Sequence, residues 1–105
     1  MNLMKYIFAN YCNPNLNTGT LARVFGYATG ALTKYLKGKT GKGVKRFIDD
    51  LRIRRAMALL VETEMTVEAV AISVGCECPR TFYRVFSAFA GITPKEYREK
   101  NRKNP

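Results

Sequence analysis

The amino-acid sequence predicts an all-α fold of about seven helices, in which two small units are joined by one long helix. Three observations support this prediction. Apolar residues recur at three- and four-residue spacing along most of the chain, no alternating strand pattern of useful length occurs, and one helical segment is repeated. The 105 residues allow one domain, or two very small ones that share a core. We expect the units at residues 1–43 and 63–105, with the joining helix at 44–62.

The three helices expected before the joining helix have local start and stop residues. The apolar spacing predicts an amphipathic helix over 2–11, which the Asn-Pro-Asn run at 13–15 ends. Asn17 can cap the next helix, and Gly26 can end it in a left-handed conformation. A third helix is expected over 29–39.

The joining helix carries two apolar faces. At about 100° per residue, the apolar residues of its first half share one face, and those of its second half lie roughly opposite. The two sets are Val44, Phe47, Ile48 and Leu51, and Ile53, Ala56, Met57 and Leu60. Because each half must bury its face against a different neighbour, we expect this helix to connect two helical units.

Three more helices are expected after the joining helix. Thr66 can cap a helix that Gly75 stops, and a proline opens the next helix, which we expect over 79–89. The pair Thr93-Pro94 combines an N-cap with a first-turn proline, and it indicates a short last helix.

An internal repeat relates the two halves of the chain. Residues 21–26 lie 49 positions before 70–75, and both segments carry Ala-x-x-x-Gly after an apolar residue. Past the turn the offset becomes 50, so that residues 32–36 correspond to residues 82–86. Each copy is a helix, a tight turn with glycine and a second helix, with a small alanine where the two helices cross. The repeat therefore predicts two helix-turn-helix subdomains.

The composition argues against most enzyme classes. Histidine is absent, so the chain has no Ser-His-Asp or Cys-His arrangement and no imidazole metal ligand. The three cysteines are an odd number and are expected to be reduced thiols. Cys76-x-Cys78 lacks the four ligands and the usual spacing of a zinc site. We expect no catalytic residue, no cofactor and no metal.

The formal net charge of +10 predicts a polyanionic partner. The first acidic residue is Asp49, and an acidic stretch at 62–77 separates two basic clusters. The clusters are Lys34, Lys37, Lys39, Lys42, Lys45 and Arg46, and Arg80, Arg84, Lys95, Arg98, Lys100, Arg102 and Lys103. No membrane partner is expected, because no apolar run approaches roughly 18 residues and no long helix sets a basic face opposite an apolar one.

A set of motifs extends from about Leu3 to Lys100. They comprise Tyr6-Ile7, Asn10-Tyr11, Leu21-Ala22, Gly26-Tyr27 and 39–42, then 47–53 with Ala56 and Leu59-Leu60, then 66–75, 82–86 and 91–98. With these motifs the chain resembles the DNA-binding domain of AraC/XylS-type transcription regulators.

The resemblance implies two homeodomain-like helix-turn-helix subdomains that bind double-stranded DNA as a monomer. Their recognition helices, at about 29–39 and 79–89, would enter successive major-groove faces. It further implies a cytoplasmic, bacterial transcription regulator, and an activator that helps to recruit RNA polymerase, because most of the family activates. No segment is left for an effector pocket. The chain is thus similar to the short MarA- and SoxS-like members, which Met1 favours, or to the C-terminal part of a longer regulator.

The sequence departs from the family pattern in the first recognition helix and after the second turn. Gly30 and Ala31 replace larger side chains. Gly38 lies inside the helix, where glycine lowers helix stability by about 1 kcal/mol relative to alanine. Cys76 stands where an aromatic residue usually follows the turn glycine. We therefore expect the second recognition helix to carry more of the specificity.

The apolar spacing divides each recognition helix into an inner and an outer face. The residues expected to face inward are Leu32, Tyr35 and Leu36, and Phe82, Val85, Phe86 and Phe89. The candidates for reading base edges are Arg80, Tyr83, Arg84, Thr33 and Lys34, since arginine can pair bidentately with guanine. The candidates for phosphate contacts are Thr29, Lys37, Lys39, Lys42, Thr81, Ser87 and Lys95.

Two other functions stay open. The chain could be a protein-interaction module that docks through the acidic stretch at 62–77, or an accessory DNA-binding part of a repair or modifying enzyme. The basic outer faces favour DNA over a purely protein partner. The arginines of the joining helix could instead be structural, paired with its own carboxylates; they are Arg52, Arg54 and Arg55, facing Asp49, Asp50 or Glu62.

Overall fold

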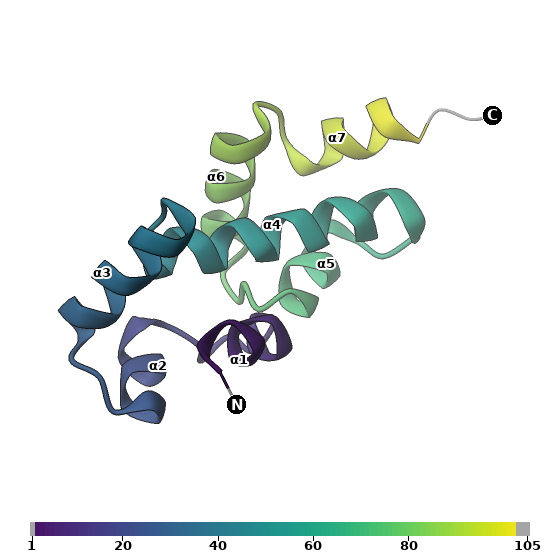
Figure 1. Cartoon of the computed structure of the whole chain (residues 1–105). Coiled ribbons are helices and arrows are strands. Elements are labelled where there is room, and N and C mark those ends of the chain that lie inside the picture. Colours follow the sequence, from purple (N-terminus) through teal and green to yellow (C-terminus); the bar gives the residue numbers. More distant parts are fainter. Residues whose placement is uncertain (1, 103–105) are drawn as a thin grey trace.

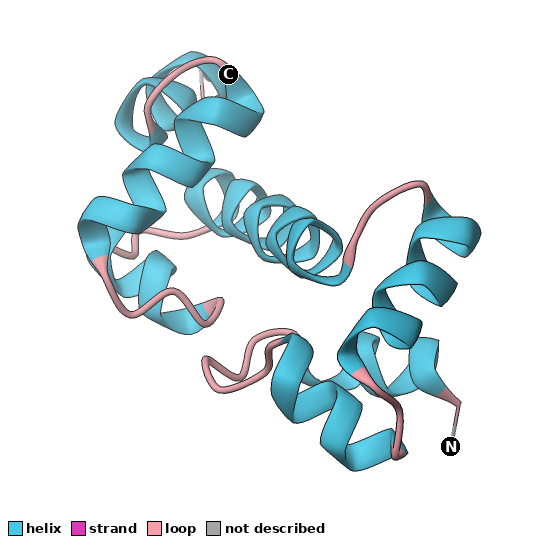
Figure 2. Ribbon diagram, turned by 90° about the vertical axis from the view of Figure 1, so that its left-hand side faces the viewer, coloured by secondary structure: helices cyan, strands magenta, loops and turns pink. Residues whose placement is uncertain are grey.

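The computed structural model describes residues 2–102, and this part of the chain forms seven α-helices and no strand (Figure 1, Figure 2). The helices are α1 (Leu3–Asn10), α2 (Thr18–Phe25), α3 (Thr29–Thr40), α4 (Val44–Glu62), α5 (Val67–Ser73), α6 (Pro79–Ala90) and α7 (Pro94–Asn101). The predicted all-α fold, with two helix-turn-helix units and a long linker helix, is confirmed. Lys103 and the outermost residues of the two expected units, 1 and 103–105, lie outside the described residues.

Local capping places the helix ends where the sequence predicts them. At the start of α2 the Asn17 side chain accepts the Thr20 N–H at 2.9 Å, and the Thr20 hydroxyl accepts the Asn17 N–H at 3.0 Å. Thr93 and Glu96 form the same reciprocal capping box at α7. Gly26 ends α2 with a left-handed φ of 71°, as predicted.

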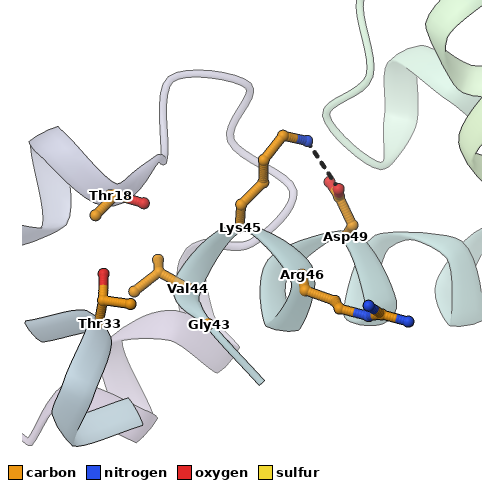
Figure 3. A pocket seen from close by; sticks show the side chains of 7 residues that line it. All are labelled: Thr18, Thr33, Gly43, Val44, Lys45, Arg46 and Asp49. Carbon is orange, nitrogen blue, oxygen red and sulfur yellow. Dashed lines mark hydrogen bonds and ion pairs between the residues drawn. The ribbon is translucent and has the colours of Figure 1, made fainter. Parts of the chain in front are cut away.

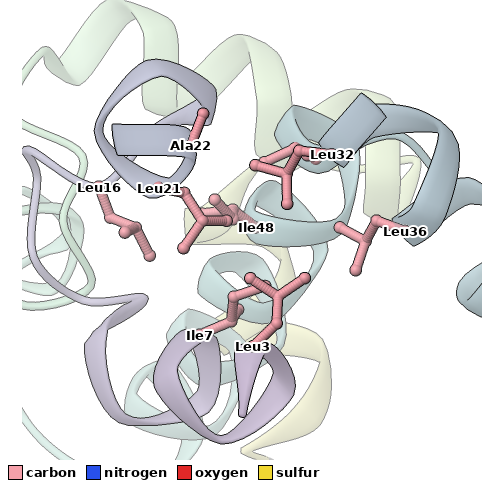
Figure 4. Close-up of a cluster of buried hydrophobic side chains, with 9 residues drawn as sticks. Leu3, Ile7, Leu16, Leu21, Ala22, Leu32, Leu36 and Ile48 are labelled. Carbon is pink, nitrogen blue, oxygen red and sulfur yellow. The ribbon is translucent and has the colours of Figure 1, made fainter. Parts of the chain in front are cut away.

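Two hydrophobic cores lie on either side of α4. The first joins α1, α2 and α3 to the start of α4, through Leu3, Ile7, Leu16, Leu21, Ala22, Leu32, Leu36, Val44 and Ile48 (Figure 4). The second joins the rest of α4 to α5 and α6, through Ile53, Ala56, Leu60, Val70, Ala71, Val74, Phe82 and Phe86. The change of apolar face along α4 is confirmed, because each half of the helix enters a different core.

The expected inner faces of the two recognition helices are too wide. Leu32 and Leu36 of α3, like Phe82 and Phe86 of α6, are fully buried, and each pair is spaced by one turn. The predictions for Tyr35 and Phe89 are wrong, because these rings are 48% and 43% exposed. Val85, also expected to face inward, is half-buried against the second core, whereas Tyr35 and Phe89 lie at the edge of the packed faces and remain in solvent.

The two units also touch directly at the second helix-turn-helix turn. A Cβ added to Gly75 would lie 2.8 Å from the carbonyl oxygen of Cys12, which follows α1. Cys12 itself packs against the second core. The molecule is elongated, with extents of 48 × 25 × 22 Å.

Candidate nucleic-acid interface

The outer face of α6 carries two free guanidinium groups. Because the buried Phe82 and Phe86 fix the rotation of the helix, Arg80 and Arg84, one turn apart, remain exposed. Among the described residues, neither arginine has a hydrogen bond or an ion pair to another side chain. Tyr83 is half-buried, with its ring edge-on to Phe82 at a centroid distance of 6.5 Å.

The remaining α6 candidates and the last-helix candidate are also accessible. Thr81 is exposed in the first turn of α6, and Ser87 is half-buried beyond Arg84. Lys95 is exposed in the first turn of α7, next to the buried Pro94. The first turn of a helix favours negative charge, so a phosphate near Lys95 would gain from both the cation and the helix dipole.

The outer face of α3 is also basic, but it carries lysines and threonines, whereas α6 carries arginines. Thr29 and Lys34 are exposed, whereas Thr33 is half-buried. Lys37 and Lys39 are exposed in the last turn, and the Lys39 ammonium lies 5.8 Å from the centroid of the Tyr35 ring. No acidic residue occurs in α3, so nothing within this helix neutralises its lysines.

Lys42 differs from the other expected phosphate contacts, because its ammonium group is held by Asp50. Burial alone would raise the pKa of the Asp50 carboxyl, but hydrogen bonds from Lys42 and Arg54 outweigh burial and hold that pKa below its usual value. The carboxylate therefore stays ionised near neutral pH, and much of the charge of Lys42 is compensated inside the protein.

Some arginines in the basic clusters are structural. Arg98 donates from Nε to the Leu60 carbonyl at 2.8 Å, and Arg102 donates from Nη2 to the Thr63 carbonyl at 2.8 Å. Of the joining-helix arginines, Arg54 pairs with Asp50 at 2.8 Å as expected. The expected carboxylate partner of Arg52 is wrong, because its guanidinium binds the backbone carbonyls that follow α1.

Arg46 is a candidate that the sequence reasoning left unassigned within its basic run. It lines a hollow with Thr33 of α3, and a second hollow with Arg84 of α6. In the first hollow the neighbouring Lys45 bends toward Asp49, 3.0 Å away, while Arg46 points elsewhere (Figure 3). Arg46 is exposed and has no ion pair among the described residues. Its place on the polar side of the first turn of α4 was the signal available in the sequence.

The described residues hold no group of three or more Cys, Asp or Glu side chains suited to a metal ion. Among the helices of residues 2–102, none is both long and apolar enough to cross a membrane.

A family model described as a helix-turn-helix domain matches residues 21–100. The chain belongs to this AraC-type helix-turn-helix family. The transcriptional activator RhaR of Enterobacter sp. (strain 638) is 37% identical over 73 residues, which are 70% of this chain and 26% of RhaR. The AraC-type chain described here thus spans about a quarter of that relative.

Solved structures have the same AraC-type fold. The C-terminal domain of the two-component response regulator yesN from Fusobacterium nucleatum superposes with a TM-score of 0.88 at 26% identity, over 91% of this chain and 93% of that one. The DNA-binding domain of AdpA, solved in complex with a target DNA, also gives 0.88, at 20% identity over 95% of this chain and 89% of that one. This AraC-type chain is a transcription-regulator DNA-binding domain, and its matched relatives are regulators rather than enzymes.

Proposed function

We propose that this domain activates transcription by binding double-stranded DNA as a monomer, with α3 and α6 in successive major-groove faces. The observation that carries the proposal is the pair of recognition helices in one elongated chain, each fixed by a buried row and each with a basic outer face. Successive major-groove faces on one side of a duplex lie about 34 Å apart, and the molecule is 48 Å long. A single chain is therefore long enough to present both helices.

The proposed roles divide the outer residues into two groups. Arg80, Tyr83 and Arg84 of α6, with Thr33 and Lys34 of α3, read base edges, because they lie on the outer faces of the two helices. Phosphates are contacted by the more peripheral set, which fixes register without reading sequence. This set is Thr29, Lys37, Lys39, Lys42, Thr81, Ser87 and Lys95, to which the hollows between the helices add Arg46.

The proposal also covers the organisation and the partners of the domain. The two faces of α4 support a division into units at 1–43 and 63–105, with 44–62 between them. Activation requires contact with RNA polymerase in the cytoplasm, and it is supported by the activator role named for the relative RhaR.

The decisive experiment is selection of bound sequences from a random duplex pool, followed by footprinting at increasing protein concentration. We expect one protein to protect roughly two helical turns, with two short preferred sequences inside the protected region. A footprint of a single turn, or binding that depends on dimerisation, would contradict the proposed monomeric mode.

A further inference from the structure

Asp50 links the end of the first recognition helix to the end of the second. It lies on α4 and, at 7% exposure, is the one buried charged residue in the described chain. One carboxylate oxygen, Oδ2, contacts the Lys42 ammonium, and the other, Oδ1, accepts from Arg54 Nε at 2.8 Å. A buried carboxylate needs such partners on both oxygens, so Asp50 holds Lys42 and Arg54 at the same time.

Each of the two cations is tied to a different recognition helix. The N–H of Lys42 donates to the hydroxyl of Thr40, the last residue of α3, at 3.1 Å, and that hydroxyl donates to the Leu36 carbonyl of α3 at 2.9 Å. Arg54 stands 5.6 Å from the centroid of the Phe89 ring, in the last turn of α6. A guanidinium stacks well on an aromatic face, and this contact holds a ring that is 43% exposed.

Most of these residues also line one hollow, which is formed by α4, α6 and the turn after α3. Lys42, Asp50 and Phe89 line it together with Arg84, which is proposed to read bases. The contacts of Asp50 therefore reach the end of α3 through Lys42 and the end of α6 through Arg54.

We propose that Asp50 is a positioning residue that fixes the separation of the two recognition helices and so selects the spacing of DNA half-sites. The inference rests on the proposed function, because it requires that both helices bind one duplex. Adding one base pair moves a half-site by about 3.4 Å and turns it by about 35°. A rigid link between the helices resists this displacement, whereas a loosened link tolerates it.

The test compares affinity for the selected site with affinity for sites that have one base pair inserted or removed between the half-sites. We expect the affinity of the wild-type protein to be at least tenfold lower for either altered site than for the selected site. Asp50→Asn should lose less than threefold in affinity on the altered sites, and its affinity for an isolated half-site should not fall, because the change frees the Lys42 ammonium and removes no DNA contact. Asp49→Asn is the matched control, because it removes the same charge from a carboxylate whose ion pair among residues 2–102 is with Lys45, on the same helix. It should keep the tenfold preference.

A second variant, on α6, tests the same link between the helices if Asp50→Asn does not fold. Phe89→Ala removes the ring beyond Arg54 at an exposed position, and it should relax the spacing preference in the same direction. The positioning role would be overturned if the folded variants kept the wild-type spacing preference, or if Asp49→Asn relaxed that preference as much as Asp50→Asn. It would also be overturned if a variant lost as much affinity for the isolated half-site as for the selected site. A wild-type protein without two preferred half-sites would instead contradict the proposed function itself.

Discussion

Two arginines close equivalent loops in the two halves of the molecule. Arg52 donates from Nε to the Tyr11 carbonyl at 2.6 Å and from Nη2 to the Asn13 carbonyl at 2.8 Å. Arg102 makes the same pair of bonds to the carbonyls of Val61 at 3.2 Å and Thr63 at 2.8 Å. Donor and acceptors are all displaced by 50 residues, the offset of the recognition helices. The repeat thus includes an arginine that ties the fourth helix of each copy, α4 or the end of α7, to the end of the first helix of that copy, α1 or α4.

The thiol of Cys78 should react faster with alkylating reagents than the thiol of Cys76. The N–H and hydroxyl of Thr81, helped by the N–H of Arg80, stabilise a thiolate at the start of α6 and lower the pKa of Cys78. Burial raises the pKa of Cys76. At a pH near 8, more Cys78 than Cys76 is therefore ionised, and Cys78 should react first with iodoacetamide in a mass-spectrometric time course.

Bound DNA provides the control for this reaction. Cys78 precedes the proposed reading helix, so specific duplex should slow its alkylation, whereas an equal concentration of scrambled duplex should slow it less. Faster labelling of Cys76 than of Cys78 in the free protein would show that the assigned thiolate environment is wrong.

Lys37 should hold the phosphate backbone without reading sequence. Its side chain is exposed in the last turn of α3, with no carboxylate in that helix. Each neutralised phosphate contributes about 0.9 to the slope of log K against log[salt], so Lys37→Ala should flatten the slope by about that amount. Binding isotherms at several salt concentrations measure the slope, and selection with the variant should return the wild-type base preferences. An altered preference would assign Lys37 to base reading.

At the scale of the helix, α3 and α6 share a fold but differ in side-chain chemistry. Both dock through a buried i, i+4 pair, and both end in a left-handed glycine. The outer face of α6 offers the guanidinium groups of Arg80 and Arg84, whereas α3 has Gly30 and Lys34 at the matching positions, 50 residues earlier. A guanidinium presents a fixed fork to guanine, while an ammonium is only a point charge. More sequence information should therefore lie under α6.

Arg84→Ala should weaken binding to the preferred site by about 1–3 kcal/mol, and binding to random DNA much less. Lys34→Ala should reduce the binding free energy for the preferred site by less than Arg84→Ala does, and it should change the base preference only weakly. Selection profiles for both variants measure the information left in each half-site, with circular dichroism as the check that each variant is folded. Equal losses from the two halves, or full specificity in a folded Arg84→Ala protein, would refute this ranking of the helices.

The helix positions were predictable because their determinants are local. Asn17, Thr66 and Thr93 each cap a helix within three residues of themselves, and the apolar spacing of α4 contains its change of face. The exposure of Tyr35 and Phe89 was not predictable, since it depends on how much of each helix the rest of its unit covers. The carbonyl partners of Arg52, Arg98 and Arg102 lie more than 30 residues away in the chain, beyond any periodic pattern. The same holds for the place of Arg46 between Thr33 and Arg84, because two hollows formed by four helices define it.

At the scale of the whole molecule, α4 is not the only connection between the units. The turn before α6 packs on the loop after α1, where the Cys12 carbonyl approaches Gly75 and the Arg52 guanidinium lies alongside. The position of the second recognition helix is thus set by two supports, one through α4 and one through this turn. A residue that separates the turn from the loop should weaken the contact between the units.

Gly75→Ala should destabilise the protein more than Gly91→Ala. Both glycines have a positive φ, of 98° and 83°, so alanine should cost about 1–2 kcal/mol at either position. A Cβ at Gly91 meets nothing within 4 Å, whereas at Gly75 it would lie 2.8 Å from the Cys12 carbonyl oxygen and 3.1 Å from Arg52 Nε. The turn and the loop must then separate, and the difference between the two variants reports that separation. Urea unfolding of the two variants measures it, and equal unfolding free energies would mean that the units do not rest on each other at Gly75.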